Sequence, residues 1–367
     1  MFSEEKKDLK AHAKTCVSIK YNSTGSMIAS ASADKKSHIY CTKTGDLLTV
    51  LDGEHNLGLN DCAWIDDRLL ATASDDKLIK VWDIETGKAI TTLHGNKSFV
   101  YCLAVDPDTK MILSGGYDGT IRLHHPATGD CVMNFDANAG AVTSVEFSPS
   151  FGTGGSIGGG QQLQRDFVSG SHDGLVRVWD YAHNAACKTS FHVEMNHSPP
   201  ISCVRYTPNG QYLLVSTLDN QLRLFSADTD SNKDPNVYES LRTYEGHKNE
   251  SYTIQTAMFF SGSDSVDGAD NTDNTDYNGN NVNNGNNGSS SGNGDNSHNY
   301  VISGSEDGGV CLWDIDDTEM KQTLEGHTNA VLAVACNPDR EAAQIASAGK
   351  DMKVKLWSTK TEGEEKE

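Results

Sequence analysis

The amino-acid sequence predicts an all-β fold, a seven-bladed WD-repeat β-propeller. At seven places, an Asp that follows an apolar stretch ending in small residues precedes an aromatic residue or a His by six positions. The second members of these pairs recur at intervals of 42, 42, 55, 46, 88 and 44 residues. This spacing indicates a unit of about 42 residues, the period of a WD blade. In the second unit, four short strands are predicted over residues 59–64, 69–74, 78–83 and 89–94.

The Asp of each pair is predicted to be a structural turn residue. It lies between the second and third strands of its unit, where a short carboxylate can accept hydrogen bonds from the amides of a tight turn. The seven turn residues are Asp34, Asp76, Asp118, Asp173, Asp219, Asp307 and Asp351. In WD repeats this Asp also bonds a His from the loop before the first strand, and the residues at that place are His12, His55, His247 and His327, with Asn96 and Asn138 as substitutes.

The seven units are expected to close into one ring. A single blade cannot bury both faces of its small sheet, so stacked neighbours supply the core and leave only short edges. We expect the propeller to span residues 11–358, with an acidic tail over 359–367. The tail is too polar for an assured fourth strand, so residues 1–10 are predicted to provide the closing strand of blade seven.

Two insertions explain the two long intervals. A Gly-rich stretch covers residues 149–161, and a second stretch covers residues 261–299 in blade six. Of the 39 residues in the second stretch, 12 are Asn, 7 Gly, 7 Ser and 6 Asp, and none is Lys or Arg. Such a composition cannot bury enough apolar surface to offset the entropy of ordering, which predicts a disordered loop between the first two strands of that blade.

Composition narrows the function classes. The chain has 30 Lys and Arg against 51 Asp and Glu, a formal charge of -21, which disfavours nonspecific binding to nucleic acid or to anionic membranes. No apolar run is long enough for a membrane helix, and the first residues lack the apolar core of a secretory signal. The nine cysteines include no CxxC pair, so they are interpreted as reduced core residues of a soluble intracellular protein.

The sequence contains no recognisable catalytic or cofactor-binding motif. The Gly-rich stretch lacks the Lys of a phosphate loop, and neither a GxSxG elbow nor an HExxH motif occurs. His124 and His125 are adjacent in a predicted strand, so their side chains would point to opposite faces. We therefore expect a protein without an active site of its own, without a cofactor and without a metal.

Equivalent positions of the seven units predict the lining of a central mouth. One ring lies five residues after the loop His position, or six in blade six, and the other lies just before the turn Asp. They are Val17, Asn60, Tyr101, Thr143, Ser202, Thr253 and Leu332, and Ala33, Asp75, Tyr117, His172, Leu218, Glu306 and Lys350. Two tyrosines and two acids near one mouth suit a peptide that carries an Arg or a Lys. The alternative is a solvent-filled channel that binds no ligand.

Three stretches carry a more specific resemblance. Residues 198–220, 246–250 and 304–307 read SPPISCVRYTPNGQYLLVSTLDN, GHKNE and GSED. With these stretches in register over nearly all its length, the chain resembles the WD-repeat subunit of COMPASS/MLL-type histone H3 lysine-4 methyltransferase complexes, in a fungal-like form. The resemblance implies a nuclear, noncatalytic scaffold. The implied partners are a SET-domain methyltransferase subunit and other WD and SPRY-type subunits, with a histone H3 tail as a candidate ligand and no direct nucleic acid or membrane contact.

The resemblance also implies two binding sites. One is an arginine-binding mouth, formed here by Ala33, Asn60, Asp75, Tyr101, Tyr117, Thr143, His172, Ser202, Tyr252, Thr253, Gln255 and Leu332. The family clamps the guanidinium between two Phe rings, whereas this chain has Tyr101 and Gln255, so one cation–π contact is missing. The other is a second partner face for an acidic and apolar segment, where Asn209, Tyr212 and Leu224 match the family and Met258 replaces an aromatic residue.

Two other functions remain open from the sequence. A substrate-receptor or signalling scaffold, in ubiquitin ligation or in ribosome-associated signalling, would use the same propeller. An RNA-processing WD protein is a third option, which the charge of -21 and the absence of a basic stripe disfavour.

Overall fold

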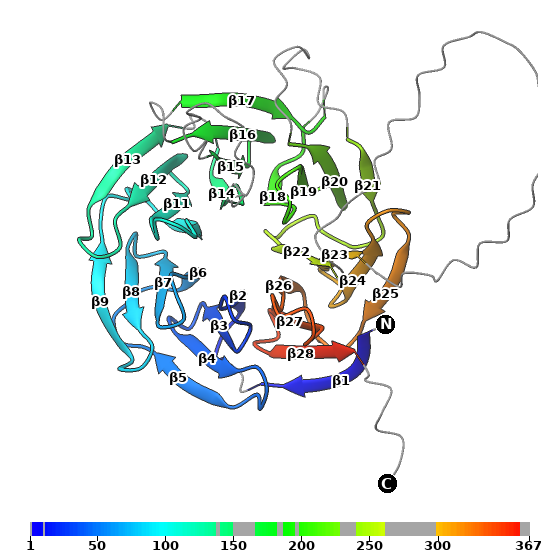
Figure 1. Cartoon of the computed structure of the whole chain (residues 1–367), viewed down its shortest axis with the longest axis horizontal. Helices are drawn as coiled ribbons and strands as arrows, with labels where there is room; N and C mark the ends of the chain where they lie inside the picture. The colour runs from blue at the N-terminus through cyan, green and yellow to red at the C-terminus, as the bar shows by residue number, and fades with distance from the viewer. Residues whose placement is uncertain are drawn as a thin grey trace, which may run out of the picture.

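The computed structural model describes residues 2–9, 12–136, 140–149, 166–181, 186–194, 198–227, 240–260 and 299–359. The regular elements within these ranges form seven four-stranded antiparallel sheets, which stand around a central axis as the blades of a propeller (Figure 1). The predicted fold class is therefore confirmed. Within these ranges no helix is long and apolar enough to cross a membrane.

The blades follow the predicted repeat. In each blade the first strand named is the one nearest the central axis, and the last is the outermost. Blades one to three consist of β2 (Cys16–Tyr21), β3 (Met27–Ser32), β4 (Ser37–Cys41) and β5 (Leu47–Leu51); β6 (Leu59–Trp64), β7 (Leu69–Ser74), β8 (Ile79–Asp83) and β9 (Lys88–Leu93); and β10 (Val100–Val105), β11 (Ile112–Gly116), β12 (Thr120–His124) and β13 (Cys131–Asp136). Blades four and five consist of β14 (Val142–Phe147), β15 (Asp166–Ser171), β16 (Leu175–Asp180) and β17 (Ala186–His192); and β18 (Ile201–Tyr206), β19 (Tyr212–Thr217), β20 (Gln221–Ser226) and β21 (Arg242–Tyr244). Blades six and seven consist of β22 (Thr256–Phe260), β23 (Asn299–Gly304), β24 (Val310–Asp314) and β25 (Met320–Leu324); and β26 (Val331–Cys336), β27 (Gln344–Gly349), β28 (Val354–Thr359) and β1 (Phe2–Asp8).

The outermost strand of blade seven comes from the start of the chain. β1 pairs antiparallel with β28, with Phe2 opposite Thr359 and Asp8 opposite Lys355. The ring of Phe2 also packs edge-on against Phe259 of blade six, with the ring centroids 5.4 Å apart. The first described residues therefore tie the last blade to its neighbour. Residues 150–161 of the Gly-rich stretch, 261–298 of the Asn-rich stretch, 360–367 of the tail, and Asn138 lie outside the described residues.

The hydrophobic core consists of clusters between neighbouring blades. Between blades three and four, the rings of Phe135, Phe167 and Trp179 pack together, with Phe167 stacked on Trp179 at 5.9 Å between ring centroids. Aromatic side chains bury large areas and gain additional energy from such ring contacts. Burial between blades thus holds the sheets around the axis.

The predicted His–Asp turn contacts are present in three blades. In blade two, His55 Nδ1 lies 2.8 Å from Asp76 Oδ2, and His55 Nε2 lies 2.9 Å from Thr72 Oγ1. The indole of Trp82 donates to the same Thr72 hydroxyl at 2.8 Å. The network therefore links the loop before β6 and the turn after β7 to the two middle strands of the blade. Blades one and seven repeat the His–Asp contact with His12 and Asp34 at 3.0 Å and with His327 and Asp351 at 2.9 Å.

Blades three, four and five use an arginine where blades one, two and seven use a histidine. In each, an Arg four residues after the turn Asp forms an ion pair with it across the turn; the pairs are Arg122 with Asp118 at 3.0 Å, Arg177 with Asp173 at 2.7 Å and Arg223 with Asp219 at 2.6 Å. Asn96, the predicted His substitute of blade three, instead accepts a hydrogen bond from Arg122 at 3.0 Å. The Asp-x-x-x-Arg spacing is visible in the sequence, but we did not predict this role.

Blade six departs from the prediction. His247 is buried, and neither of its ring nitrogens has a hydrogen-bond partner, so its predicted contact with Asp307 is wrong. Here Asp307 accepts from the amide of Gly309, and the indole of Trp313 donates to the carbonyl of Glu245. The hydroxyl of Ser303, which corresponds to Thr72, donates to the carbonyl of Gly304. The partners of the usual network are thus diverted to the backbone.

Replacing Asp173 by Ala should lower the free energy of unfolding by about 1 to 3 kcal/mol, because it leaves the largely buried Arg177 without its carboxylate. Burial alone would raise the pKa of Asp173, but hydrogen bonds from Arg177 and Ser171 hold that pKa below its ordinary value. Urea unfolding followed by circular dichroism measures the change. Asp130→Ala, which removes an exposed carboxylate in blade three, should have no effect, and equal effects of the two substitutions would contradict the prediction.

The free energy of unfolding should fall as the pH drops from about 6.5 to about 4. Burial lowers the pKa of both His124 and His247 from 6.5 to about 4. Over this interval the unfolded chain binds protons that the folded chain does not, so each histidine destabilises the fold by up to about 3 kcal/mol. Unfolding at pH 7, 5.5 and 4.5 tests this. His247→Asn should flatten the dependence and the exposed-site control His94→Gln should not; identical pH profiles of the three proteins would refute the assignment.

Candidate functional site

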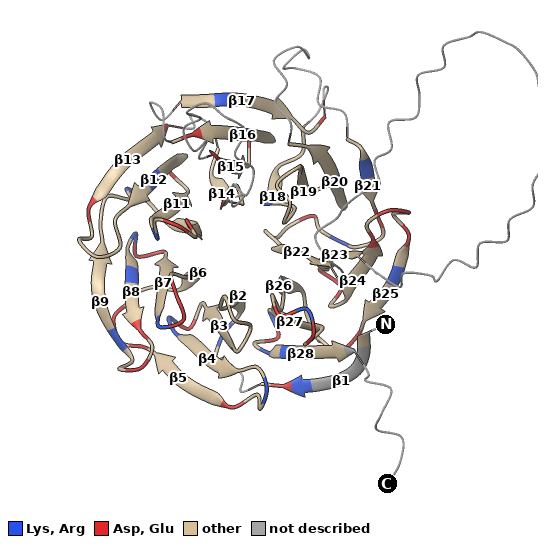
Figure 2. Cartoon of the chain, in the orientation of Figure 1, with Lys and Arg blue, Asp and Glu red and all other residues tan. Residues whose placement is uncertain are grey.

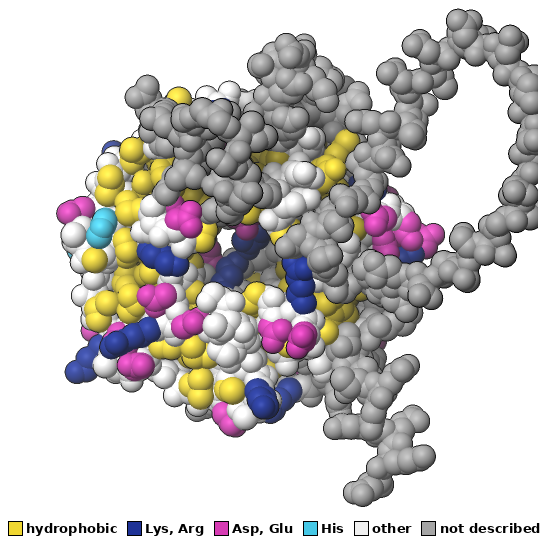
Figure 3. Space-filling model, in the orientation of Figure 1, with side chains coloured by type: hydrophobic (Ala, Val, Ile, Leu, Met, Phe, Trp, Pro, Cys, Tyr) yellow, Lys and Arg dark blue, Asp and Glu magenta, His cyan; other side chains and the backbone are white. Residues whose placement is uncertain are grey.

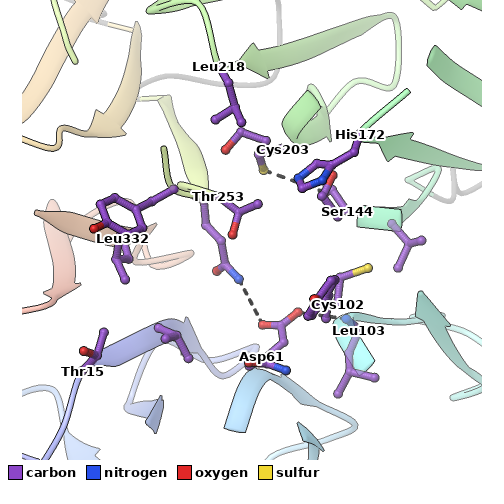
Figure 4. A pocket seen from close by; sticks show the side chains of 18 of the residues that line it. Thr15, Asp61, Cys102, Leu103, Ser144, His172, Cys203, Leu218, Thr253 and Leu332 are labelled. Carbon is purple, nitrogen blue, oxygen red and sulfur yellow. Dashed lines mark hydrogen bonds between the residues drawn. The ribbon is translucent and has the colours of Figure 1, made fainter. Parts of the chain in front are cut away.

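The structure brings most of the predicted mouth residues together around one cavity. This upper cavity has a volume of about 510 Å³. In Figure 4, Asp61, Thr253 and His172 surround it from three different blades. Ten of the twelve mouth residues line it, namely Ala33, Asn60, Tyr101, Thr143, His172, Ser202, Tyr252, Thr253, Gln255 and Leu332.

The other two predicted mouth residues lie at its rim. Asp75 accepts a hydrogen bond from the side chain of Asn60 at 2.7 Å and does not line the cavity itself. Tyr117 is 62% exposed, and its ring meets that of Tyr101 edge-on at 6.3 Å between centroids. Phe99, 40% exposed, extends this aromatic surface at 6.2 Å from Tyr117. The expectation that Asp75 and Tyr117 line the cavity is thus corrected: they flank it.

The innermost strands supply two further rings below the mouth. Alternate residues of a strand face the same side, so each inner strand presents one residue at the narrow waist of the channel and another two positions later. The waist residues are Ser18, Asp61, Cys102, Ser144, Cys203, Gln255 and Ala333, and the lower residues are Lys20, Ala63, Ala104, Glu146, Arg205, Ala257 and Ala335. Continuing the repeat arithmetic by one position finds six of the seven waist residues in the sequence, but in blade six it gives Ile254 instead of Gln255.

Gln255 crosses the channel at the waist. Its side-chain Nε2 donates to Asp61 Oδ1 at 3.1 Å, and its Oε1 accepts from Lys20 Nζ at 2.8 Å and from Ser18 Oγ at 3.3 Å. Its backbone amide donates to the carbonyl of Leu332 at 2.8 Å. Gln255 therefore ties blade six to blades one, two and seven, and its amide group is already engaged within the protein.

Asp61 is the buried acceptor at the centre of this tie. Only 2% of the residue is exposed, and its carboxylate also accepts from the Ser18 hydroxyl at 2.7 Å and from the Leu103 amide at 2.8 Å. A buried carboxylate needs such donors to offset its lost hydration. On the other side of Gln255, burial lowers the pKa of Lys20. The waist is a filled hydrogen-bond network rather than an open passage.

A second cavity opens on the other side of the waist. This lower cavity has a volume of about 730 Å³ and is lined by all seven residues of the lower ring. Arg205 lies 3.2 Å from Glu146, and the two cavities share Arg205 and Leu103 in their walls. Figure 3 shows Lys and Arg side chains in and beside the hollow at the centre of the ring. The four alanines of the lower ring leave room that larger side chains would fill.

Tyr252 forms another wall of the upper cavity. It is 37% exposed, and the ammonium of Lys350 lies 4.2 Å from the centroid of its ring and 2.6 Å from its hydroxyl. The loop that carries Tyr252 is held by Glu306, whose Oε1 accepts from the backbone amides of residues 250, 251 and 252 at 2.9, 2.6 and 3.0 Å. The upper cavity therefore has an aromatic residue on two sides, one of them already in contact with a cation.

The predicted second partner face lies between blades five and six. Asn209 is in the turn after β18, Tyr212 starts β19, and Met258, in β22, lines the lower cavity. Tyr212 and Met258 are partly buried and pack against the cluster between these blades. Leu224 is 2% exposed and belongs to that cluster, so its assignment to an exposed face is wrong. It supports the face from beneath.

No ligand set for a metal occurs among the described residues. They contain no group of three or more His, Cys, Asp or Glu side chains placed to hold an ion. The cysteines are free thiols, five of them buried and Cys187 exposed. Lys and Arg are dispersed over the blades of the described part rather than gathered in a stripe (Figure 2). The chemistry available at the cavities is therefore hydrogen bonding, ion pairing and contact with aromatic rings.

Known proteins resemble this chain over its whole propeller. Residues 8–358 match the family described as the WDR5 beta-propeller domain. The WD repeat domain-containing protein 83 homolog of Dictyostelium discoideum is 23% identical, over 96% of this chain and 97% of that protein. Pre-mRNA-processing factor 17 of Homo sapiens is 23% identical over 70% of this chain, and the ribosome biogenesis protein WDR12 homolog of Ixodes scapularis is 27% identical over 70%. The matched regions cover 35% and 53% of these two proteins.

Replacing Gln255 by Leu should lower the free energy of unfolding by about 1 to 3 kcal/mol. The substitution leaves the buried Asp61 with one donor fewer and removes the acceptor of the Lys20 ammonium. Thermal and urea unfolding measure the loss. Gln211→Leu removes an exposed amide from the turn of blade five and serves as the control. If the two variants are equally stable, the waist network does not stabilise the ring.

Proposed function

Because the chain belongs to the WDR5 β-propeller family, we propose that it is a noncatalytic scaffold subunit of a nuclear histone H3 lysine-4 methyltransferase complex. The three stretches that resemble the COMPASS-type subunit carry the methyltransferase part of this proposal, and the family match over residues 8–358 supports the propeller scaffold. A propeller offers two mouths and a rim to partners and needs no active site of its own. In this role the chain holds a SET-domain subunit and other WD and SPRY-type subunits together.

A second candidate is a scaffold subunit in a different complex. Two of the three relatives described above are named for pre-mRNA processing and for ribosome biogenesis. These names favour an RNA-processing or ribosome-associated assembly over a methyltransferase, whereas the three stretches that resemble the COMPASS-type subunit favour the methyltransferase. Both complexes are consistent with a nuclear location, and in both the propeller contacts proteins through its faces. The identity of the copurifying chains separates them.

The upper cavity is the proposed peptide site of this scaffold. Tyr101 can stack on a guanidinium, and Asp75 at the rim adds negative charge. The family's opposing ring is absent, because Gln255 is tied to Asp61 and Lys20. An arginine-containing peptide or a histone tail would therefore bind weakly by itself. A second contact through the partner face would raise its effective concentration at this site.

Affinity purification of the tagged chain, followed by identification of the copurifying proteins, tests the proposal. We expect a SET-domain subunit, and recovery of pre-mRNA-processing or ribosome-assembly proteins in its place would establish the second candidate. Tyr212→Ala should reduce recovery of the partner bound at the second face, since aromatic residues contribute strongly to such contacts. Ile90→Ala, an exposed apolar residue on an outer strand, is the matched control. Equal recovery with both variants would exclude Tyr212 from the interface.

A further inference from the structure

We propose that Lys350 is a built-in competitor that occupies the Tyr252 wall of the upper cavity and sets how tightly a cationic side chain binds there. This inference rests on the proposed function of the upper cavity as a peptide site. It adds a specificity-determining residue, because it states which cation a ligand must displace. In a cavity with two free aromatic walls, by contrast, a ligand cation would have no side chain of the protein to displace.

Lys350 and Tyr252 come from neighbouring blades. Lys350 follows β27 in blade seven, where its amide donates to the carbonyl of Ala330 at 2.8 Å. Tyr252 lies in the loop before β22, whose amides are held by Glu306. Both backbones are therefore fixed. The flexible part is the Lys350 side chain, which spans the gap to the tyrosine.

The Lys350 ammonium makes two interactions with Tyr252. It lies 4.2 Å from the ring centroid of Tyr252, within the range of a cation–π interaction. It also donates to the Tyr252 hydroxyl at 2.6 Å. Among the described residues, no carboxylate forms an ion pair with Lys350. The tyrosine is therefore its described partner, and a ligand cation that uses the hydroxyl end of this ring must replace the ammonium.

The other walls that the structure describes around the upper cavity offer a ligand cation only one free aromatic ring, so access to the Tyr252 ring affects how tightly the cation binds. Gln255 is committed to the waist network, so it offers no free amide plane to a guanidinium. Tyr101 is the free aromatic wall inside the cavity, with Tyr117 beside it at the rim. A ligand arginine that displaces Lys350 gains Tyr252 as its second ring. Arginine suits this exchange because its planar guanidinium stacks on aromatic faces and is less strongly hydrated than an ammonium.

The test compares peptide binding by the intact chain and by Lys350→Met, which keeps an apolar stem and removes the charge. The probes are a capped Gly-Ala-Arg-Ala-Gly peptide and the same peptide with Ala in place of Arg, titrated by calorimetry. We expect Lys350→Met to bind the arginine peptide about two- to thirtyfold more tightly, the range of one cation–π contact. The alanine peptide should show no gain. Lys77→Met, an exposed lysine just after the turn Asp of blade two, removes the same charge and should leave binding unchanged.

The double variant Lys350→Met with Tyr252→Leu should return to the affinity of the intact chain, because the exposed ring is then gone. Lys350→Gln provides a second charge-free variant, and a melting curve of each confirms folding. Equal binding by the intact chain and both Lys350 variants would overturn this inference and leave the peptide site standing. An equal gain in Lys77→Met would also overturn it, since the effect would then be one of net charge. Absence of peptide binding in every variant would overturn both this inference and the peptide site.

Discussion

The ring depends on the pairing of its first strand with its last blade. β1 completes blade seven by pairing with β28, and Phe2 reaches further, to Phe259 of blade six. Asp8 adds ion pairs with Lys353 and Lys355. Without this strand, blade seven would expose an unpaired edge and the ring would have no covalent link across its closure. Because every cavity and face described above lies between blades, each exists only while this closure holds.

The repeat spacing was sufficient to predict the fold because it is a local property of the chain. An Asp and an aromatic residue six positions apart lie on adjoining parts of one blade, so their distance along the chain fixes their distance in space. The same reasoning placed eleven of its fourteen ring residues at the upper cavity, since equivalent positions in a closed ring surround one axis, whereas Tyr252 and Gln255 were implied only by the family resemblance. It also matched the inner strands of blade two closely, with β6 spanning Leu59–Trp64.

Contacts between distant blades could not be predicted in this way. Gln255 meets Asp61 and Lys20 across a sequence separation of 194 and 235 residues, and nothing local to Gln255 reveals that its side chain turns into the channel. The contact between Lys350 and Tyr252 joins neighbouring blades, but its residues are also far apart in the sequence, by 98 positions. Leu224 was misplaced for the opposite reason: the family pattern marks its position but does not state whether the side chain faces the solvent or the core. His247 shows that a matching residue type does not guarantee the matching contact.

The filled waist divides the channel into two separate compartments. A side chain that enters the upper cavity meets Gln255 and Asp61, whereas one that enters the lower cavity meets the ring that contains Lys20 and Glu146. Two partners can therefore occupy opposite mouths without steric overlap, and binding of one leaves the other mouth open. Energetic coupling between the two mouths would have to pass through the shared walls at Arg205 and Leu103, or through the bond of Gln255 to Lys20. A complex built on such a hub can assemble in either order and reach the same final composition.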